Sequence, residues 1–164
     1  MVKKETALAF AEHDHDRCCG DTLKKADQLA KERGLRLTPV RRRTLEILLE
    51  SHKALGAYEV LERLKEDGFG SQPPVAYRAL EFLVDNGLAH RVRRLNAFTA
   101  CMAPGAPHRP VFLICDSCDH VAEAPSTDVY DAVTAAAGEV GFTVDRVSLE
   151  AAGLCPACQK DTQA

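Results

Sequence analysis

The start of the sequence lacks a long apolar run. The run from Ala7 to Ala11 is too short for the hydrophobic core of a signal peptide or for a membrane span. We therefore expect a cytoplasmic protein with no membrane partner. In that reducing compartment the seven cysteines are expected to serve as thiolate ligands, and their odd number leaves at least one outside any disulfide scheme.

The sequence also lacks the overall positive charge that is typical of nucleic-acid-binding proteins, because its formal net charge is -3. The charge is unevenly distributed, however. Residues 1–103 contain 18 Lys and Arg against 15 Asp and Glu, whereas residues 104–164 contain 3 against 9. Five arginines lie between Arg33 and Arg43, and three lie between Arg91 and Arg94. Such clusters suit phosphates, although two solvated charged faces would give the same pattern.

Two Cys-x-x-Cys pairs are the strongest chemical signal. Cys115 and Cys118 form the first pair, and Cys155 and Cys158 form the second. Two pairs with equal internal spacing can supply the four thiolates of a tetrahedral zinc site. Buried or redox-active cysteines are the alternative, but a redox site needs only one pair.

The first twenty residues are rich in ligand atoms, with His13, His15, Cys18 and Cys19 close together. They have no fixed spacing to a second cluster. Residues 1–20 are therefore interpreted as a mobile, polar N-terminal arm, and an accessory metal site is the alternative.

Helix and strand signals between residues 21 and 103 predict a winged helix-turn-helix domain. Caps, prolines at helix starts and glycines at helix ends delimit four helices, and two short strands follow. The helices are expected over Asp21–Gly34, Thr38–His52, Gly56–Gly68 and Pro73–Asn86, and the strands over Leu88–Arg93 and Ala97–Met102. In this fold the last helix enters the major groove and the wing touches the DNA backbone.

The Pro- and Gly-rich stretch 103–107 is interpreted as a joint to a second domain over residues 104–164. Its pattern predicts strands over Val111–Ile114, Val121–Ala124 and Phe142–Ala152, with a helix over Thr127–Ala137. The whole chain is thus predicted to be α+β, with a small C-terminal α/β dimerisation domain. A homodimer is expected because about sixty residues cannot hide these apolar faces alone.

Four segments resemble the ferric uptake regulator superfamily, and most closely its zinc uptake regulator branch. They are residues 34–41 (GLRLTPVR), 73–83 (PPVAYRALEFL), 115–118 (CDSC) and 153–158 (GLCPAC). The resemblance implies a metal-responsive repressor that binds palindromic DNA, with an AT-rich operator expected, and that controls zinc uptake genes. An iron- or peroxide-responsive regulator and a zinc-stapled interaction module without DNA binding are the alternatives.

The resemblance implies two Zn²⁺ ions per chain. The four cysteines become a structural site, and a regulatory site consists of His90, Cys101, His108 and Glu123. The Cys101 thiolate of the regulatory site favours zinc over iron. The ligands of this site lie on both sides of the joint. Zinc would then select the dimer arrangement that fits DNA.

Six residues are candidates for DNA contacts. Tyr77 and Arg78 are expected to read bases, and Tyr58, Arg36, Arg41 and Ser71 to position phosphates. The family commonly has threonine after the proline pair, whereas Val75 and Ala76 offer no hydroxyl. His120 stays unassigned.

An enzyme is not expected. Zinc deaminases combine His-x-Glu with Pro-Cys-x-x-Cys, whereas His120 and Glu123 have the wrong spacing and Leu154 precedes Cys155. A hydrolase built on Cys101 and His108 would lack any oxyanion-hole motif.

Overall fold

The computed structural model describes residues 9–106 and 108–162. Residues 1–8 of the predicted arm and Pro107 of the predicted joint lie outside this description. Across the described ranges, no helix has the length and apolar character needed to cross a membrane.

The first helix begins earlier than the sequence predicts. Helix α1 spans His15–Arg33, and its N-cap is Asp14, whose carboxylate accepts a hydrogen bond from the Arg17 backbone N–H at 3.0 Å. The prediction of a start at Asp21 was wrong because this earlier cap was overlooked. The predicted end was right, since Gly34 is the C-cap in the left-handed conformation (φ 63°).

The remaining elements of the first domain confirm the predicted winged helix-turn-helix order. Helices α2, α3 and α4 span Pro39–Leu49, Ala57–Glu66 and Pro73–Asp85, and strands β1 and β2 span Ala89–Val92 and Ala97–Ala100. Helix α2 ends three residues before His52, and the wing strands are shorter than predicted. Apolar stripes of the helices meet in one core, which includes the fully buried Leu45, Leu48, Leu64, Leu80 and Leu83.

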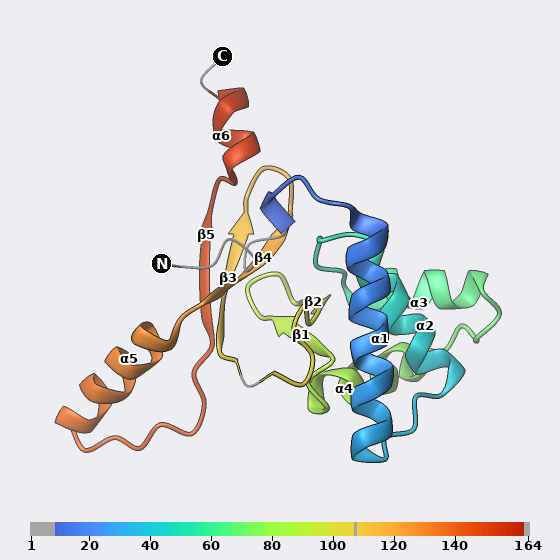
Figure 1. The fold of residues 1–164 in the computed structure, drawn as a ribbon, viewed down its shortest axis with the longest axis horizontal. Helices are drawn as coiled ribbons and strands as arrows, with labels where there is room; N and C mark the ends of the chain where they lie inside the picture. The colour runs from blue at the N-terminus through green and yellow to red at the C-terminus, as the bar shows by residue number, and fades with distance from the viewer. Residues whose placement is uncertain (1–8, 107, 163–164) are drawn as a thin grey trace.

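The second domain contains a three-stranded sheet, and helix α5 extends away from one end of it (Figure 1). Strands β3, β4 and β5 span Pro110–Cys115, Val121–Pro125 and Leu149–Gly153, and helices α5 and α6 span Thr127–Glu139 and Pro156–Thr162. The strand order is β4-β3-β5, with β3 antiparallel to β4 and parallel to β5.

Two details of the second domain differ from the prediction. The strand predicted over Phe142–Ala152 begins only at Leu149, because β3 offers partners to Leu149–Gly153 alone. Helix α6 was not predicted, although Pro156 at its first position is typical of a helix start.

The wing and the sheet share a small core of their own. Val92 of β1 packs with Phe112, Ile114 and Val121 of β3 and β4, and all four are buried. The Glu150 carboxylate of β5 accepts hydrogen bonds from the backbone N–H groups at the wing turn, Arg93 at 2.6 Å and Arg94 at 2.8 Å. The two domains are therefore in direct contact in this arrangement.

Helix α5 projects away from the helical domain (Figure 1) and buries only Tyr130. Beside it, Val140 is 81% exposed and Phe142 65% exposed. This apolar surface agrees with the expectation of a second copy packing here.

Candidate metal centres and DNA-binding face

The structure brings together the four cysteines that the sequence paired. Cys115 ends β3, Cys118 lies in the turn to β4, and Cys155 and Cys158 lie before and within α6. Their sulfurs lie within 4.8 Å of one another. Cys118 Sγ and Cys155 Sγ are 3.8 Å apart, and Zn–S bonds of 2.3 Å place tetrahedral sulfurs about 3.8 Å apart. We call this set the four-cysteine cluster.

A backbone hydrogen bond favours ionisation of one of these thiols, that of Cys115. The Cys155 backbone N–H donates to Cys115 Sγ at 3.3 Å and lowers the pKa of the Cys115 thiol to about 6. Burial, together with the neighbouring thiols, raises the pKa of Cys118 to about 12. Four thiolates cannot gather so closely without a cation, so the site requires one to ionise fully.

The four residues predicted for the regulatory site also converge. His90 lies on β1, Cys101 follows β2, His108 precedes β3 and Glu123 lies on β4. Their ligand atoms lie within 4.8 Å of one another. His108 Nε2 is 3.5 Å from Cys101 Sγ and 3.1 Å from Glu123 Oε2, near the edges of about 3.6 and 3.3 Å of a tetrahedral zinc site. We call this set the mixed-ligand cluster.

A buried nitrogen in the mixed-ligand cluster lacks a hydrogen bond. Among the buried side-chain nitrogen and oxygen atoms of the described residues, His90 Nε2 alone has no hydrogen-bond partner. Glu123 Oε1 is 3.5 Å away from it. Buried polar atoms normally have a partner. A metal ion between the four residues would use this nitrogen, so the residues fit a bound ion.

The neighbouring bonds also suit a metal ligand set. His108 Nδ1 donates to the Ala106 carbonyl at 2.8 Å, which leaves Nε2 free to face the cluster. The hydrogen bonds with Cys101 and Glu123 raise the pKa of His108 to about 11. Although burial opposes it, the neighbouring imidazoles of His108 and His90 lower the pKa of Cys101. In the metal-free cluster His108 therefore keeps its proton near neutral pH.

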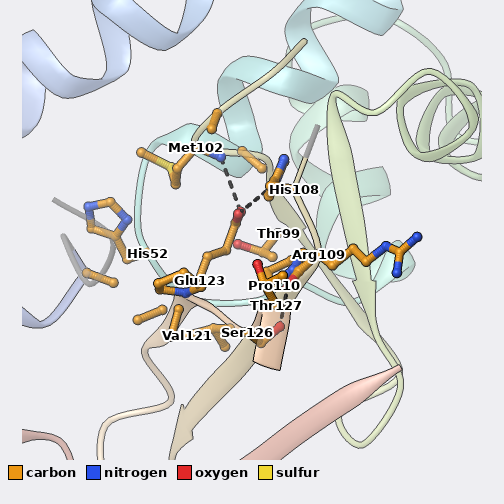
Figure 2. A pocket seen from close by; sticks show the side chains of 16 residues that line it. His52, Thr99, Met102, His108, Arg109, Pro110, Val121, Glu123, Ser126 and Thr127 are labelled. Carbon is orange, nitrogen blue, oxygen red and sulfur yellow. Dashed lines mark hydrogen bonds and ion pairs between the residues drawn. The ribbon is translucent and has the colours of Figure 1, made fainter. Parts of the chain in front are cut away.

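A cavity of about 300 Å³ opens beside the cluster. Figure 2 shows Glu123 pointing toward His108 and toward the Met102 backbone N–H, which donates to Glu123 Oε1 at 3.2 Å. His52 lines the same cavity on the other side of Glu123 (Figure 2). The carboxylate is thus held at the joint between the domains.

The predicted DNA-reading residues lie on the exposed side of α4 and its neighbours. Tyr77 is 41% exposed and Tyr58 65% exposed, and their rings meet edge to face at 6.5 Å between centroids. Arg78 on α4 and Ser71 before it are exposed. The edge of α4 therefore offers aromatic, cationic and hydroxyl groups together.

The arginines of α2 are less free than their clustering suggested. Arg42 pairs with Asp27 and Glu46, and Arg43 with Glu46, Glu50 and Asp67. The Arg41 guanidinium lies 3.6 Å from the Phe82 ring centroid and donates to the Arg36 carbonyl at 2.8 Å, whereas the Arg36 side chain is exposed. Internal ion pairs thus neutralise much of the cluster.

Sequence reasoning missed one group of ligand atoms. His13, His15 and His52 have ring nitrogens within 4.8 Å of one another. The sequence shows the ligand atoms of the arm, but the distant His52 carries no signal because only the fold brings it near. His120, left unassigned, has Nδ1 3.1 Å from Cys118 Sγ and so lies against the four-cysteine cluster.

The fold and the ligand clusters define a winged-helix protein joined to a cysteine-rich sheet domain. The sequence model described as "Ferric uptake regulator family" matches residues 32–152, and the chain belongs to this family. It is similar to the zinc uptake regulation protein of Escherichia coli (strain K12), with 34% identity over 84% of this chain and 81% of the relative.

Solved structures show the same similarity. A zinc uptake regulator complexed with zinc and DNA has a TM-score of 0.84 at 33% identity, covering 89% of this chain and 98% of that one. Holo XcZur has a TM-score of 0.77 at 38% identity, covering 85% and 98%. Apo XcZur scores only 0.51 at the same identity, covering 87% and 99%.

Proposed function

We propose that this chain is a cytoplasmic, zinc-responsive transcriptional repressor that binds palindromic, AT-rich operator DNA as a zinc-loaded homodimer. Its targets would be genes of zinc uptake and homeostasis. The observation that best supports this proposal is the mixed-ligand cluster. Its four ligands come from both sides of the 103–107 joint, and one of their atoms, His90 Nε2, is buried without a hydrogen-bond partner. No catalytic role is assigned to any residue.

The two clusters would have different tasks. The four-cysteine cluster would hold a structural zinc ion, because four thiolates bind zinc tightly enough to keep it whenever the domain is folded. The mixed-ligand cluster would hold the regulatory ion, since a set of one thiolate, two imidazoles and one carboxylate exchanges protons with solvent on binding. Two zinc ions per chain are therefore proposed for these sites.

The mechanism rests on how the ligands are distributed. A bound zinc ion would supply a tetrahedral cation that His90 and Cys101 meet from the wing and His108 and Glu123 from the sheet domain. Those residues would then hold the wing against β3 and β4, and with it the orientation of α4. In a dimer, two α4 helices must lie about one DNA turn apart to enter successive major grooves.

The comparison with XcZur supports this mechanism. At equal identity the chain resembles the holo form far more than the apo form, and here the wing packs directly on the sheet. The DNA-bound relative, also similar over nearly its whole length, supports the assignment of DNA as partner. Tyr77 and Arg78 would contact bases, and Tyr58, Arg36, Arg41 and Ser71 phosphates.

Gel-shift titrations with an AT-rich palindrome test the proposal. Wild type should bind with zinc and release the DNA when a chelator is added. Cys101→Ala, His90→Ala and Glu123→Ala should each weaken the zinc-dependent binding. Unchanged zinc-dependent affinity in all three variants would sink the mechanism, and no binding by zinc-loaded wild type would favour a zinc-stapled interaction module.

A further inference from the structure

Three histidines that the proposed function does not use lie close together at the boundary between the two domains. His13 precedes α1, His15 is its first residue, and His52 lies in the loop after α2. The three ring centroids lie 4.9 to 5.9 Å apart. His13 Nε2 is 3.0 Å from His52 Nε2, near the edge of about 3.3 Å between two nitrogens of a tetrahedral zinc site. We call these residues the histidine triad.

The hydrogen bonds around the triad are those of metal-ligating histidines. His13 Nδ1 donates to the Ala11 carbonyl at 2.8 Å, so Nε2 is the nitrogen that faces His52, and the two Nε2 atoms share a hydrogen bond at 3.0 Å. His15 Nε2 donates to the Glu50 carbonyl at 3.0 Å, so Nδ1, which lies 3.9 Å from Cys19 Sγ, is the nitrogen that would bind a metal ion. A ligating imidazole commonly gives its other N–H to a carbonyl in this way, which fixes the ring and its tautomer.

The other ligand groups near the triad are already engaged elsewhere. Cys19 Sγ is 3.5 Å from His15 Nε2 but donates its S–H to the Leu49 carbonyl at 2.9 Å, so it acts as a neutral thiol. The Glu50 carboxylate is occupied by Arg43 and Arg63. Three imidazoles are therefore the available ligands.

We propose that His13, His15 and His52 form a third zinc site, which fastens the N-terminal segment to the joint between the domains. The backbone next to the triad is attached directly to the second domain. The His52 carbonyl accepts a hydrogen bond from the Val121 N–H of β4 at 2.9 Å, and the backbones of Lys53 and His120 form an isolated antiparallel β-bridge. Three imidazoles leave the fourth position to water, and the absence of thiolate makes this site weaker than the other two. His13 and His15 precede the residues matched by the family model, 32–152.

The site can be tested on the full chain without DNA, so its outcome is independent of the proposed function. Zinc uptake is measured from buffered zinc solutions for wild type, His52→Gln, and the double variant His13→Asn with His15→Asn. Asp16→Asn is the control, because it changes an exposed neighbour outside the triad. Wild type and control should each bind one zinc ion per chain more than either histidine variant, which is about three against two if the other two clusters are filled.

Hydrogen exchange gives the second readout. At free zinc about 100 times the dissociation constant of the site, exchange of the backbone amides at residues 13–16 should slow by about a hundredfold in wild type and not in His52→Gln. A third ion that persists in both histidine variants is an adventitious ion only and overturns the site. A wild type that binds no more zinc than the two histidine variants overturns it as well.

Discussion

The replacement Glu123→Gln is the sharpest test of the mixed-ligand cluster. Glutamine keeps the shape of the side chain, and its carbonyl oxygen can still accept the Met102 N–H. It removes the negative charge that lies 3.1 Å from His108 Nε2 and 3.5 Å from His90 Nε2. The variant therefore removes the proposed zinc ligand while it preserves the packing of β4.

The expected magnitude follows from the position of the carboxylate. Losing even an outer partner of a metal ligand costs about 10 to 100-fold in metal affinity, and Glu123 would be a direct ligand. We expect a loss of about 100-fold, which corresponds to about 2.7 kcal/mol. At a free zinc concentration that half-fills the wild-type site, occupancy in the variant should be about 1%.

The assay is operator binding by fluorescence anisotropy across a series of buffered zinc concentrations. The midpoint for Glu123→Gln should move upward by about two decades, and saturating zinc should restore the DNA affinity. Glu150→Gln is the matched control, since Glu123 and Glu150 pair with Phe112 from opposite sides of β3. Its carboxylate lies outside the mixed-ligand cluster and holds the wing turn instead, so its zinc midpoint should move by far less than two decades. Equal midpoints for wild type and Glu123→Gln would refute the assigned ligand.

Three further predictions concern the other ligands and the DNA face. Cys118→Ser should lower the free energy of unfolding by at least about 3 kcal/mol and remove one zinc ion per chain. The reason is that structural zinc contributes about 10 to 16 kcal/mol in zinc-finger peptides. Thermal unfolding measures the loss of stability, and metal analysis measures the loss of zinc. Zinc affinity of the mixed-ligand cluster should rise with pH between about 6 and 8, by about one decade per pH unit for each proton displaced. The sign follows from the raised pKa of His108, about 11, since binding near neutral pH must remove its proton. Arg78→Ala should cost about 1 to 3 kcal/mol on the operator and relax its specificity, whereas Arg36→Ala should weaken all sequences alike and reduce the salt slope by about 1.

Matched measurements decide these three. Cys18→Ser is the control for Cys118→Ser, because Cys18 lies on α1 and outside the four-cysteine cluster; equal stability of the two variants would contradict a structural ion. A zinc affinity that does not change with pH would contradict proton displacement. If Arg78→Ala weakened operator and random DNA equally, Arg78 would be a phosphate contact.

The local signals predicted the first domain well because each has a short-range cause. Pro73 at the start of α4 and glycines such as Gly34 at helix ends act on their own backbone. The extent of β5 was not predictable in the same way, because it depends on where β3 offers partners. Asp14 as a cap for α1 was a local signal that was overlooked.

The candidate sites show the same division. The two Cys-x-x-Cys pairs carry their own spacing, and the mixed-ligand cluster came from family resemblance rather than from periodicity. His52 had neither source of information, because its neighbours His13 and His15 are almost forty residues away in the sequence. Ion pairs such as those of Arg42 and Arg43 are equally invisible to a count of charges, since they depend on which acidic side chains the fold places opposite.

The apolar contact between Val92 and the sheet has a consequence for the steepness of regulation. Separating the domains would bring Val92, Phe112, Ile114 and Val121 into water, at a cost of about 1.5 to 3 kcal/mol for each side chain fully uncovered. The apolar contact therefore favours the joined form even before an ion binds. About 5.5 kcal/mol of differential affinity moves a two-state equilibrium from 1:99 to 99:1. Burial of these side chains supplies part of that free energy, so the ion has to contribute less of it.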